Sequence, residues 1–403
     1  MSANAASRLT SKPLPFRPMT VAGIMSGTSA DGIDVALLEI HPNRGKLKLD
    51  LIGHRAFPFS PALRKAILGA MDAKSISTAE LARLHWRLGQ AYAEAMRATL
   101  DRYPCRLELI GCHGQTIYHQ ATASLYAGRN VACTWQIGEP ALLASELGVP
   151  VVSNFRPADM VAGGQGAPLV PLLDYVQFAD KKRARVLQNI GGIGNLTLVP
   201  PASGTDKVLA FDTGPGNMVI DALMQRLFDK PYDRGGKTAA KGSVLTSALA
   251  ATMRHPFFKA APPKSAGREE FGAAFVENFL RACKKVKGTK EDIIATATAL
   301  TAESIADAFT LFVSPHLQRG TAVDYIVSGG GAKNGALTEM LRRKLQPLGC
   351  ELMQTADAGI PVDAKEAVAF ALLAYYTWHR HPANVPSATG AKRPAILGQV
   401  TYV

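Results

Sequence analysis

The sequence predicts an α/β protein of two domains. Apolar runs with strand character alternate with helical segments along the chain, which is the pattern of sheets covered by helices. The length of 403 residues exceeds the size at which a single hydrophobic core stops growing. A cycle of strand, glycine-rich loop and strand begins near residue 21 and again near residue 184. The two cycles share the order of their elements but not their residues. This repeat predicts a domain boundary near residues 150–160.

The elements of the first half follow one another without a linker. Strands are expected at 20–25, 33–40 and 47–57, and helices at 61–72 and 77–100, the second beginning after Ser77 and Thr78. Residues 106–116 are expected to form a strand that ends in a loop, followed by a short helix at 139–148 and a last apolar segment at 149–155.

The second half repeats strands and glycine turns before its helices. Residues 184–199 are predicted as strand, glycine turn and strand, and residues 208–217 as a strand that ends in a Gly-Pro-Gly loop. Helices are expected at 270–286 and 290–315, then a strand, a triple-glycine turn and a helix within 324–345, and a final helix at 363–380.

The overall composition of the chain bears on which partners and which cellular compartment we expect. The net charge of +13 is dispersed, and its densest clusters, at 181–185 and 283–290, lack interleaved aromatic residues, so a solvated basic face is favoured over nucleic-acid binding. No apolar run approaches the length of about 18 residues that a membrane span requires, so we expect no membrane partner. The five cysteines form no C-x-x-C pair, which favours a reduced, cytoplasmic protein. Residues 1–18 are expected to be a disordered extension, with an organellar transit peptide as the alternative.

The opening loop, "GIMSGTSADGID" at residues 23–34, is unusually rich in glycine, hydroxyl and carboxylate groups. Successive glycines free backbone N–H groups to converge on a phosphate, and Asp31 and Asp34 could hold the accompanying Mg²⁺. The alternative is a long hairpin loop whose Ser and Asp side chains satisfy its own backbone. Neither "GGKT" at 235–238 nor "GGIGN" at 191–195 meets the spacing of a common nucleotide-binding motif.

Two further loops contain candidate residues for catalysis and for nucleotide binding. In "LAFDTGPGN" Asp212 ends an apolar strand, where a rigid element can hold a carboxylate as a general base, and Gly214 and Gly216 allow a close backbone approach to phosphate. The alternative for Asp212 is a simple turn residue. In "VSGGGAKN" at 327–334 the triple glycine allows a planar nucleoside to lie on bare backbone, and a plain strand-to-helix connection is the alternative.

Taken together, these loops resemble the plan of the sugar kinase, Hsc70 and actin superfamily, and more closely that of the anhydro-N-acetylmuramic acid kinases. Eight segments carry this resemblance in order, from about residue 21 to the C terminus: "GIMSGTSADGID", "GCHGQT", "TWQIGEPALLA", "NFRPADMVAGGQGAPLVP", "NIGGIGNLT", "FDTGPGN", "SGGGAKN" and "GIPVDAKEAVAFALLA". The departures from the family pattern are the N-terminal extension and Ala30, where a larger apolar residue is common.

The resemblance implies a two-domain actin-like ATPase (ribonuclease H-like) fold with ATP in the interdomain cleft. On this basis we expect a disordered extension at 1–20, domain I at 21–155 completed by 381–403, and domain II at 156–380. Enzymes of the family use ATP and water to convert 1,6-anhydro-N-acetylmuramic acid into N-acetylmuramic acid 6-phosphate. Homodimerisation is implied by the family alone.

The resemblance also implies roles for individual residues. Asp212 matches the catalytic base, and Glu366 the second carboxylate that orients water or sugar. The expected ATP contacts are Gly27, Thr28, Ser29, Ala30, Asp31, Gly32, Ile33, Asp34, Gly191, Gly192, Gly214, Gly216, Asn217, Gly329, Gly330, Gly331 and Asn334, with Mg²⁺ at Asp31 and Asp34. The expected sugar contacts are His113, Gln115, Thr116, Gln136, Arg156 and Asp159.

Several alternatives remain for these assignments. Arg156 could grip the lactyl carboxylate of muramic acid or form an ion pair with Asp159, and His113 could be a structural histidine. At the level of the whole chain, the alternatives are a kinase of another amino sugar or sugar acid, and a non-enzymatic ATP-driven switch.

Overall fold

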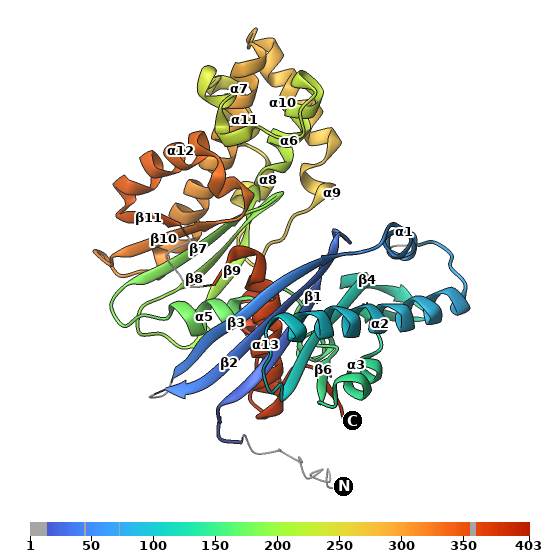
Figure 1. The fold of residues 1–403 in the computed structure, drawn as a ribbon. Helices are drawn as coiled ribbons and strands as arrows, with labels where there is room; N and C mark the ends of the chain where they lie inside the picture. The colour runs from blue at the N-terminus through green and yellow to red at the C-terminus, as the bar shows by residue number, and fades with distance from the viewer. Residues whose placement is uncertain (1–13, 44–45, 72, 355–359) are drawn as a thin grey trace, which may run out of the picture. The chain divides into compact units, whose positions relative to one another are not determined.

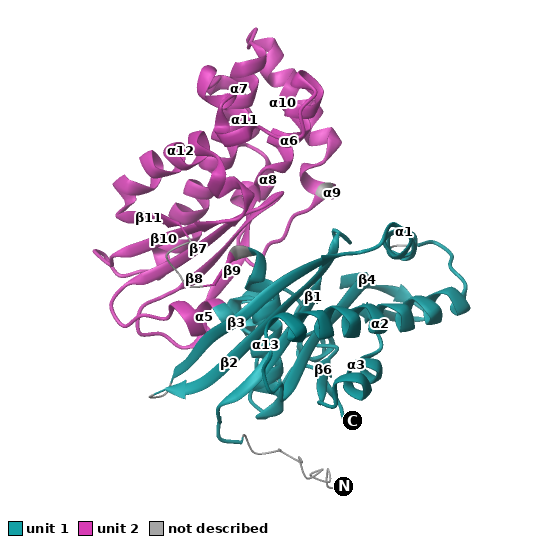
Figure 2. Ribbon diagram, in the orientation of Figure 1, with its two compact units in different colours: residues 1–173, 363–403 teal, residues 174–362 magenta. Residues whose placement is uncertain are grey.

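The structure is a computed structural model that describes residues 14–43, 46–71, 73–354 and 360–403. The chain divides into two compact units, which Figure 2 colours separately: residues 1–173 with 363–403, and residues 174–362. Two domains were predicted, but the expected boundaries after residues 155 and 380 differ from those observed. Residues 156–173 and 363–380 belong to the first unit because the helices that they contain pack within it.

The first unit contains a seven-stranded sheet. Along the sheet the order is β3-β2-β1-β4-β6-β12, and β5 pairs with the outer part of β4. β1, β2 and β3 are antiparallel, whereas β4 and β6 run parallel to β1 and β12 is antiparallel to β6. The strands span Met19–Ser26 (β1), Gly32–Asn43 (β2), Lys46–Pro58 (β3), Leu109–Tyr126 (β4), Arg129–Ile137 (β5), Val151–Ser153 (β6) and Gln399–Thr401 (β12).

Helices cover both faces of this sheet (Figure 1). On one face, Ala22 and Ile24 of β1 share a core with apolar residues of α1, α2 and α3. On the other face α13 lies so close that a Cβ on Gly23 would come within 1.8 Å of the carbonyl oxygen of Ala367. The helices span Pro61–Ala70 (α1), Thr78–Arg102 (α2), Pro140–Leu147 (α3), Arg156–Val161 (α4), Lys365–Trp378 (α13) and Pro386–Thr389 (α14), and α5 (Pro171–Phe178) crosses the boundary between the units.

A long β-hairpin of the first unit was not predicted. β4 continues beyond Thr116 as far as Tyr126 and forms a hairpin with β5, where a loop was expected. Ala127 and Gly128 both have positive φ angles, of +47° and +80°, as a two-residue hairpin turn of type I′ requires. The sequence signal was therefore Gly128, the glycine of the turn between the two strands.

The second unit contains a five-stranded sheet of order β11-β10-β7-β8-β9. β7, β8 and β9 are antiparallel, whereas β10 and β11 run parallel to β7. The strands span Ala184–Ile190 (β7), Ile193–Val199 (β8), Leu209–Pro215 (β9), Val323–Ser328 (β10) and Cys350–Gln354 (β11). The helices span Met218–Phe228 (α6), Thr246–Thr252 (α7), Pro256–Lys259 (α8), Arg268–Phe271 (α9), Ala273–Lys285 (α10), Lys290–Ala308 (α11) and Gly335–Leu345 (α12).

The two sheets share one topology. In each, three antiparallel strands are followed by two that run parallel to the first, giving β3-β2-β1-β4-β6 in the first unit and β9-β8-β7-β10-β11 in the second. This is the strand order of the ribonuclease H-like fold, and its occurrence twice confirms the predicted fold class. Among the described residues, no helix is both long and apolar enough to cross a bilayer.

Candidate active site

Three glycine-rich turns meet at one edge of the second sheet. β7, β9, β10 and β11 all run in the same direction, so their carboxyl ends share an edge, where ligands bind in open α/β sheets. The turn 191–192 follows β7, the turn 214–217 follows β9, and the turn 329–331 follows β10. The predicted ATP-contacting residues of this unit are thus brought together by the sheet itself.

The first two of these turns are joined through their backbones. The N–H groups of Gly216 and Asn217 donate to the carbonyl oxygens of Gly192 and Gly191, at 2.9 and 2.7 Å. A Cβ on Gly216 would come within 2.3 Å of the Gly191 oxygen, so the approach requires glycine. From α11, the hydroxyl of Thr301 donates to the Gly216 carbonyl oxygen at 2.8 Å.

The third turn packs against the end of β7. Gly329 has a φ of +81°, and a Cβ on Gly331 would come within 2.3 Å of the Ile190 side chain. Gly330, by contrast, is exposed, so this turn presents bare backbone. Asn334 is buried and caps α12, its side-chain oxygen accepting the Leu337 N–H at 3.1 Å. A contact of Asn334 with nucleotide stays a prediction, and its observed role is the helix cap.

Asp212 lies at this same edge, on β9. A bulge at Thr213 interrupts the pairing of β8 with β9, since Asn195 lies opposite Asp212 and Gly194 opposite Gly214. Bulges re-aim side chains and are frequent beside active sites. The Ala266 N–H donates to Oδ2 of Asp212 at 2.8 Å. Burial is the main cause that raises the pKa of Asp212 to about 6, partly opposed by this hydrogen bond and by Lys264. A carboxyl with this pKa suits a general base near neutral pH.

In the first unit, the opening loop is the turn of the β1–β2 hairpin. The Ala30 N–H donates to the Gly27 carbonyl oxygen at 3.1 Å, and Ala30 is fully buried with a φ of +51°. Thr28 and Ser29 are exposed, whereas Gly32 and Ile33 already belong to β2. The loop therefore offers an exposed tip of hydroxyl groups on a rigid base, which is compatible with the predicted phosphate contact.

A glutamine holds this loop to β4. Gln115 is fully buried, and its side-chain nitrogen donates to the Gly27 carbonyl oxygen at 3.0 Å. Next to it, Gln136 of β5 donates to the Thr116 hydroxyl at 3.1 Å. The side-chain oxygens of Gln115 and Gln136 are buried and accept no hydrogen bond within the described residues. Two buried acceptors without donors are suited to the hydroxyl or amide groups of a sugar.

His113 and Arg156 form a hydrogen-bonded pair. Nδ1–H of His113 donates to the Gly114 carbonyl oxygen at 2.7 Å, and Nε2 accepts from Nε of Arg156 at 3.1 Å. Burial and the adjacent guanidinium lower the pKa of His113 to about 3, so the ring stays neutral. The terminal nitrogens of Arg156 donate to no other described residue. His113 therefore orients Arg156, and the face left free matches the planar geometry of a carboxylate.

The expected alternative of an Arg156–Asp159 ion pair is not observed. Asp159 is fully buried, and its carboxylate accepts hydrogen bonds from Gly166 N–H, Asn384 and Thr389, at 2.7 to 2.8 Å. These bonds join α4 to the C-terminal segment. A direct sugar contact by Asp159 stays a prediction, while the observed contacts are those of a structural carboxylate.

Glu366 lies in the first turn of α13, close to Asp34 and Arg156. Burial and the charge of Asp34 raise the pKa of Glu366, and Arg156 and Lys365 oppose this rise. Asp34 itself pairs with Nε2 of His54 at 3.1 Å. Because α13 belongs to the first unit, Glu366 and Asp212 lie on different units, which corrects the assignment of both to domain II. The packing of α13 on β1 and β4 decides this, and no local sequence signal reports it.

Asp31 and Asp34 were the predicted Mg²⁺ ligands. One oxygen of Asp31 accepts the Ser29 hydroxyl at 2.7 Å, and the side chain is exposed. Within the described residues no three His, Cys, Asp or Glu side chains gather in a metal-binding group. Mg²⁺ commonly takes only one or two carboxylates, with water and phosphate completing its shell, so these two residues fit such an ion in chemistry.

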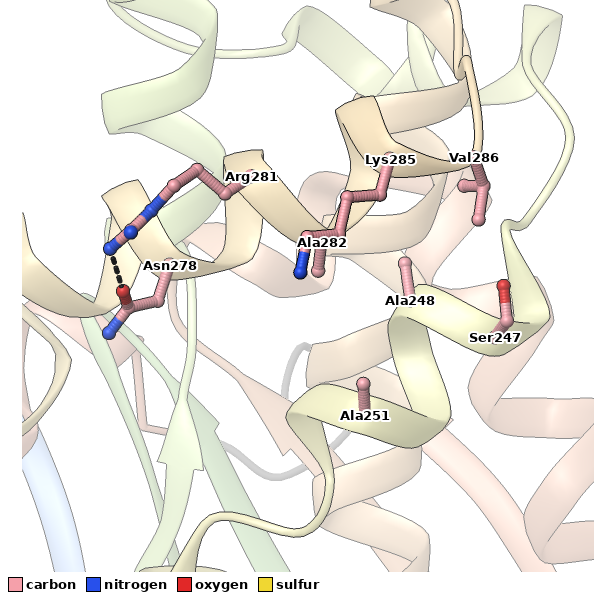
Figure 3. A pocket seen from close by; sticks show the side chains of 8 residues that line it. All are labelled: Ser247, Ala248, Ala251, Asn278, Arg281, Ala282, Lys285 and Val286. Atoms are coloured by element: carbon pink, nitrogen blue, oxygen red, sulfur yellow. Dashed lines mark hydrogen bonds between the residues drawn. The ribbon is translucent and has the colours of Figure 1, made fainter.

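Some residues of these sites were missed from the sequence. Thr301, Lys264 and Ala266 approach the phosphate-type loop or Asp212 from segments that carry no motif. Gly236 was set aside with "GGKT", yet a Cβ on it would come within 2.2 Å of the Asn334 side-chain oxygen, so it packs against the start of α12. A separate hollow of about 420 Å³ lies between α7 and α10. Figure 3 labels the residues that line it: Ser247, Ala248, Ala251, Asn278, Arg281, Ala282, Lys285 and Val286. It includes none of the predicted site residues.

Comparison with known proteins gives the family. Two curated relatives are anhydro-N-acetylmuramic acid kinases from different strains of Bacillus cereus. One is 45% identical over 387 residues, covering 95% of this chain and 99% of the relative. The other, from strain ATCC 14579, is 46% identical over 387 residues, covering 95% and 97%.

Solved structures resemble the chain only distantly. A ROK hexokinase from Thermus thermophilus is 15% identical with a TM-score of 0.37, over 90% of this chain and 100% of that chain. Component A of an Acidaminococcus fermentans (R)-2-hydroxyglutaryl-CoA dehydratase is 13% identical with a TM-score of 0.42, over 89% and 98%. Such similarities carry no conclusion about activity. The sequence pattern of one family, however, described as anhydro-N-acetylmuramic acid kinase, matches residues 19–403, and the chain belongs to that family.

Proposed function

We propose that this chain is an ATP-dependent kinase that converts 1,6-anhydro-N-acetylmuramic acid and water into N-acetylmuramic acid 6-phosphate. The observation that carries the proposal is the position of Asp212, a partly buried carboxyl beside three converging glycine turns in a member of this kinase family. The product places the chain in peptidoglycan recycling and amino-sugar catabolism, in the cytoplasm.

Asp212 acts as the base. In an anhydro sugar O6 is bonded to C1 and carries no proton, so the nucleophile for phosphorus must first be released. Asp212 takes a proton from water as the water oxygen bonds to C1; the C1–O6 bond breaks, and O6 attacks the γ-phosphorus while ADP leaves. The Ala266 N–H holds Oδ2 in place, so the carboxylate meets the water in a fixed orientation.

The first unit supplies the sugar contacts. Arg156 grips the lactyl carboxylate through its terminal nitrogens, because Nε is already committed to His113. Gln115 and Gln136 offer acceptor oxygens, and Thr116 lies beside them. Glu366 orients the sugar or the attacking water.

The nucleotide is assigned to the glycine turns of the second unit and to the hydroxyl-rich tip at 27–31. Gly192 and Gly330 are exposed and carry no side chain over the backbone, which allows phosphate or nucleoside to approach closely. Mg²⁺, held through Asp31 or Asp34, would neutralise phosphate charge. The family also suggests a homodimer, which light scattering would test.

The decisive test is the reaction in ¹⁸O-water with mass analysis of the product. We expect ¹⁸O at the anomeric oxygen and phosphate on O6. Parallel assays should use N-acetylglucosamine and N-acetylmuramic acid, both of which have a free 6-hydroxyl. Turnover of these two sugars alone, or an ATPase equally fast without sugar, would contradict the proposed reaction.

A further inference from the structure

Lys264 lies beside Asp212 but belongs to none of the motifs. It is part of an irregular segment between α8 and α9, and its side chain is half-buried within the second unit. Lysine is seldom buried without a partner. Among the described residues, however, Lys264 forms no ion pair, so its position requires another explanation.

The backbone around Lys264 holds Asp212 from both sides. The Asp212 N–H donates to the Lys264 carbonyl oxygen at 3.1 Å, and two residues later the Ala266 N–H donates to Oδ2 of Asp212 at 2.8 Å. This pair of bonds attaches the segment to β9 at the residue proposed as base. The segment consequently fixes both the backbone and the carboxylate of Asp212.

The ammonium group of Lys264 is enclosed by aromatic rings. Nζ lies 4.6 Å from the ring centroids of Phe257 and Phe312 and 5.8 Å from that of Phe211, the residue before Asp212. It also donates to the Phe257 carbonyl oxygen at 3.0 Å. Ring faces attract a cation, so the three phenyl groups hold the charge near Asp212 without direct contact. A direct ion pair would occupy the carboxylate and weaken it as a base.

We propose that Lys264 is a positioning residue for Asp212. Its backbone anchors the segment that fixes the carboxylate, and its ring-enclosed ammonium keeps a positive charge beside the ionised base while leaving that base free to take a proton. The electrostatic effect of Lys264 on Asp212 involves residues of the second unit alone. Its consequence for catalysis rests on the proposed function.

Within the described part of the chain, few other charges act on Asp212. Glu269 of α9 acts in the opposite direction from Lys264 and raises the pKa of Asp212. Burial lowers the pKa of Lys264 to about 8, and Asp212 counteracts this fall. On the elements packed against β9, His255 pairs with Glu270, and Glu303 of α11 pairs with Lys344. Among the described residues, Lys264 is thus the cation that lowers the pKa of Asp212 and favours its ionised form.

The test is to titrate the Asp212 carboxyl directly, by ¹³C NMR of protein labelled at aspartate, with Asp212→Asn to assign the signal. Lys264→Met removes the charge and keeps an apolar stem among the rings, Lys264→Gln is a second neutral variant, and Lys264→Arg keeps the charge. Lys290→Met is the matched control, because Nζ of this exposed lysine also lies over a ring, that of Phe228 at 6.0 Å, but does not act on Asp212. The pH profile of kcat/KM is measured on the same proteins.

Removal of the charge should raise the Asp212 midpoint by about one pH unit, a typical effect of a neighbouring charge. The acid limb of the pH profile of kcat/KM should move by the same amount. The kcat/KM of the neutral variants should therefore be roughly tenfold below that of wild type at pH values below both midpoints, and nearly unchanged at pH 8. Lys264→Arg and Lys290→Met should keep the wild-type midpoint. An unchanged midpoint in both neutral variants, or an equal loss of activity at every pH, overturns the proposal. A shifted midpoint in a protein that does not turn over the anhydro sugar would refute the proposed function and leave the link from Lys264 to Asp212 intact.

Discussion

Replacement of Asp212 by asparagine should remove activity and at the same time stabilise the second unit above neutral pH. Asparagine keeps an oxygen that can accept the Ala266 N–H, but it cannot take a proton from water. Loss of a general base typically costs a factor of about 10²–10⁴ in rate. Because this base also has to release the nucleophile, we expect a loss at or beyond the upper end, with ATP and sugar binding retained.

The effect on stability follows from the pKa of Asp212. Burial raises it from 3.8 to about 6 in the folded chain. Between these values the folded state binds the proton more tightly than the unfolded state, so the free energy of unfolding falls as pH rises through this window. A rise of about two units corresponds to about 3 kcal/mol in all, of which about half develops between pH 5 and pH 7.5. Asp212→Asn lacks this dependence, so its stability relative to wild type should increase over that interval by about 1.5 kcal/mol.

The assay is urea unfolding at pH 5 and pH 7.5, followed by far-ultraviolet circular dichroism. Trp86, Trp135 and Trp378, the three tryptophans of the chain, lie in the first unit, so their fluorescence reports the unfolding of that unit as an internal control. The fluorescence transition should be the same in both proteins. If the variant gains no stability relative to wild type between the two pH values, Asp212 does not have the raised pKa on which its role as base depends.

The remaining predictions concern the sugar site, the glycine turns and the first unit. Arg156→Met should raise KM for the anhydro sugar about 10–100-fold, as loss of a charge-assisted hydrogen bond implies, and this difference should vanish with an anhydro sugar that lacks the lactyl group. Gly216→Ala should destabilise the second unit by about 1–3 kcal/mol and weaken ATP binding in calorimetry, since its Cβ would collide with the Gly191 oxygen. Gly192→Ala is the control for folding, because its Cβ meets only ordinary contacts. Asp159→Asn should lower the fluorescence-detected stability of the first unit by about 2 kcal/mol, and wild-type stability would contradict its structural role.

The sequence by itself determined the fold class, the family and the loops that carry chemistry. Glycine runs at the ends of apolar strands are local signals, because only glycine permits the close backbone approach seen between Gly216 and Gly191. Asp212 was also visible from the sequence, because it precedes a Gly-Pro-Gly turn, although the structure places it within β9 at the bulge and not at the end of the strand. The opening loop was visible from its local excess of hydroxyl and carboxylate groups. The helix starting after Ser77 was equally local, since its cap joins Ser77 to Glu80 three residues later.

The tertiary structure alone decided which residues meet. The division of the chain depended on α13, whose apolar residues packed on the sheet of the first unit although they follow the second unit in sequence. His113 and Arg156 are 43 residues apart, and Lys264 approaches Asp212 across 52 positions. No periodicity or motif encodes such pairs, because burial and charge act through space and not along the chain. The sequence therefore predicted Asp212 as the base, and the fold decided the environment of this carboxylate.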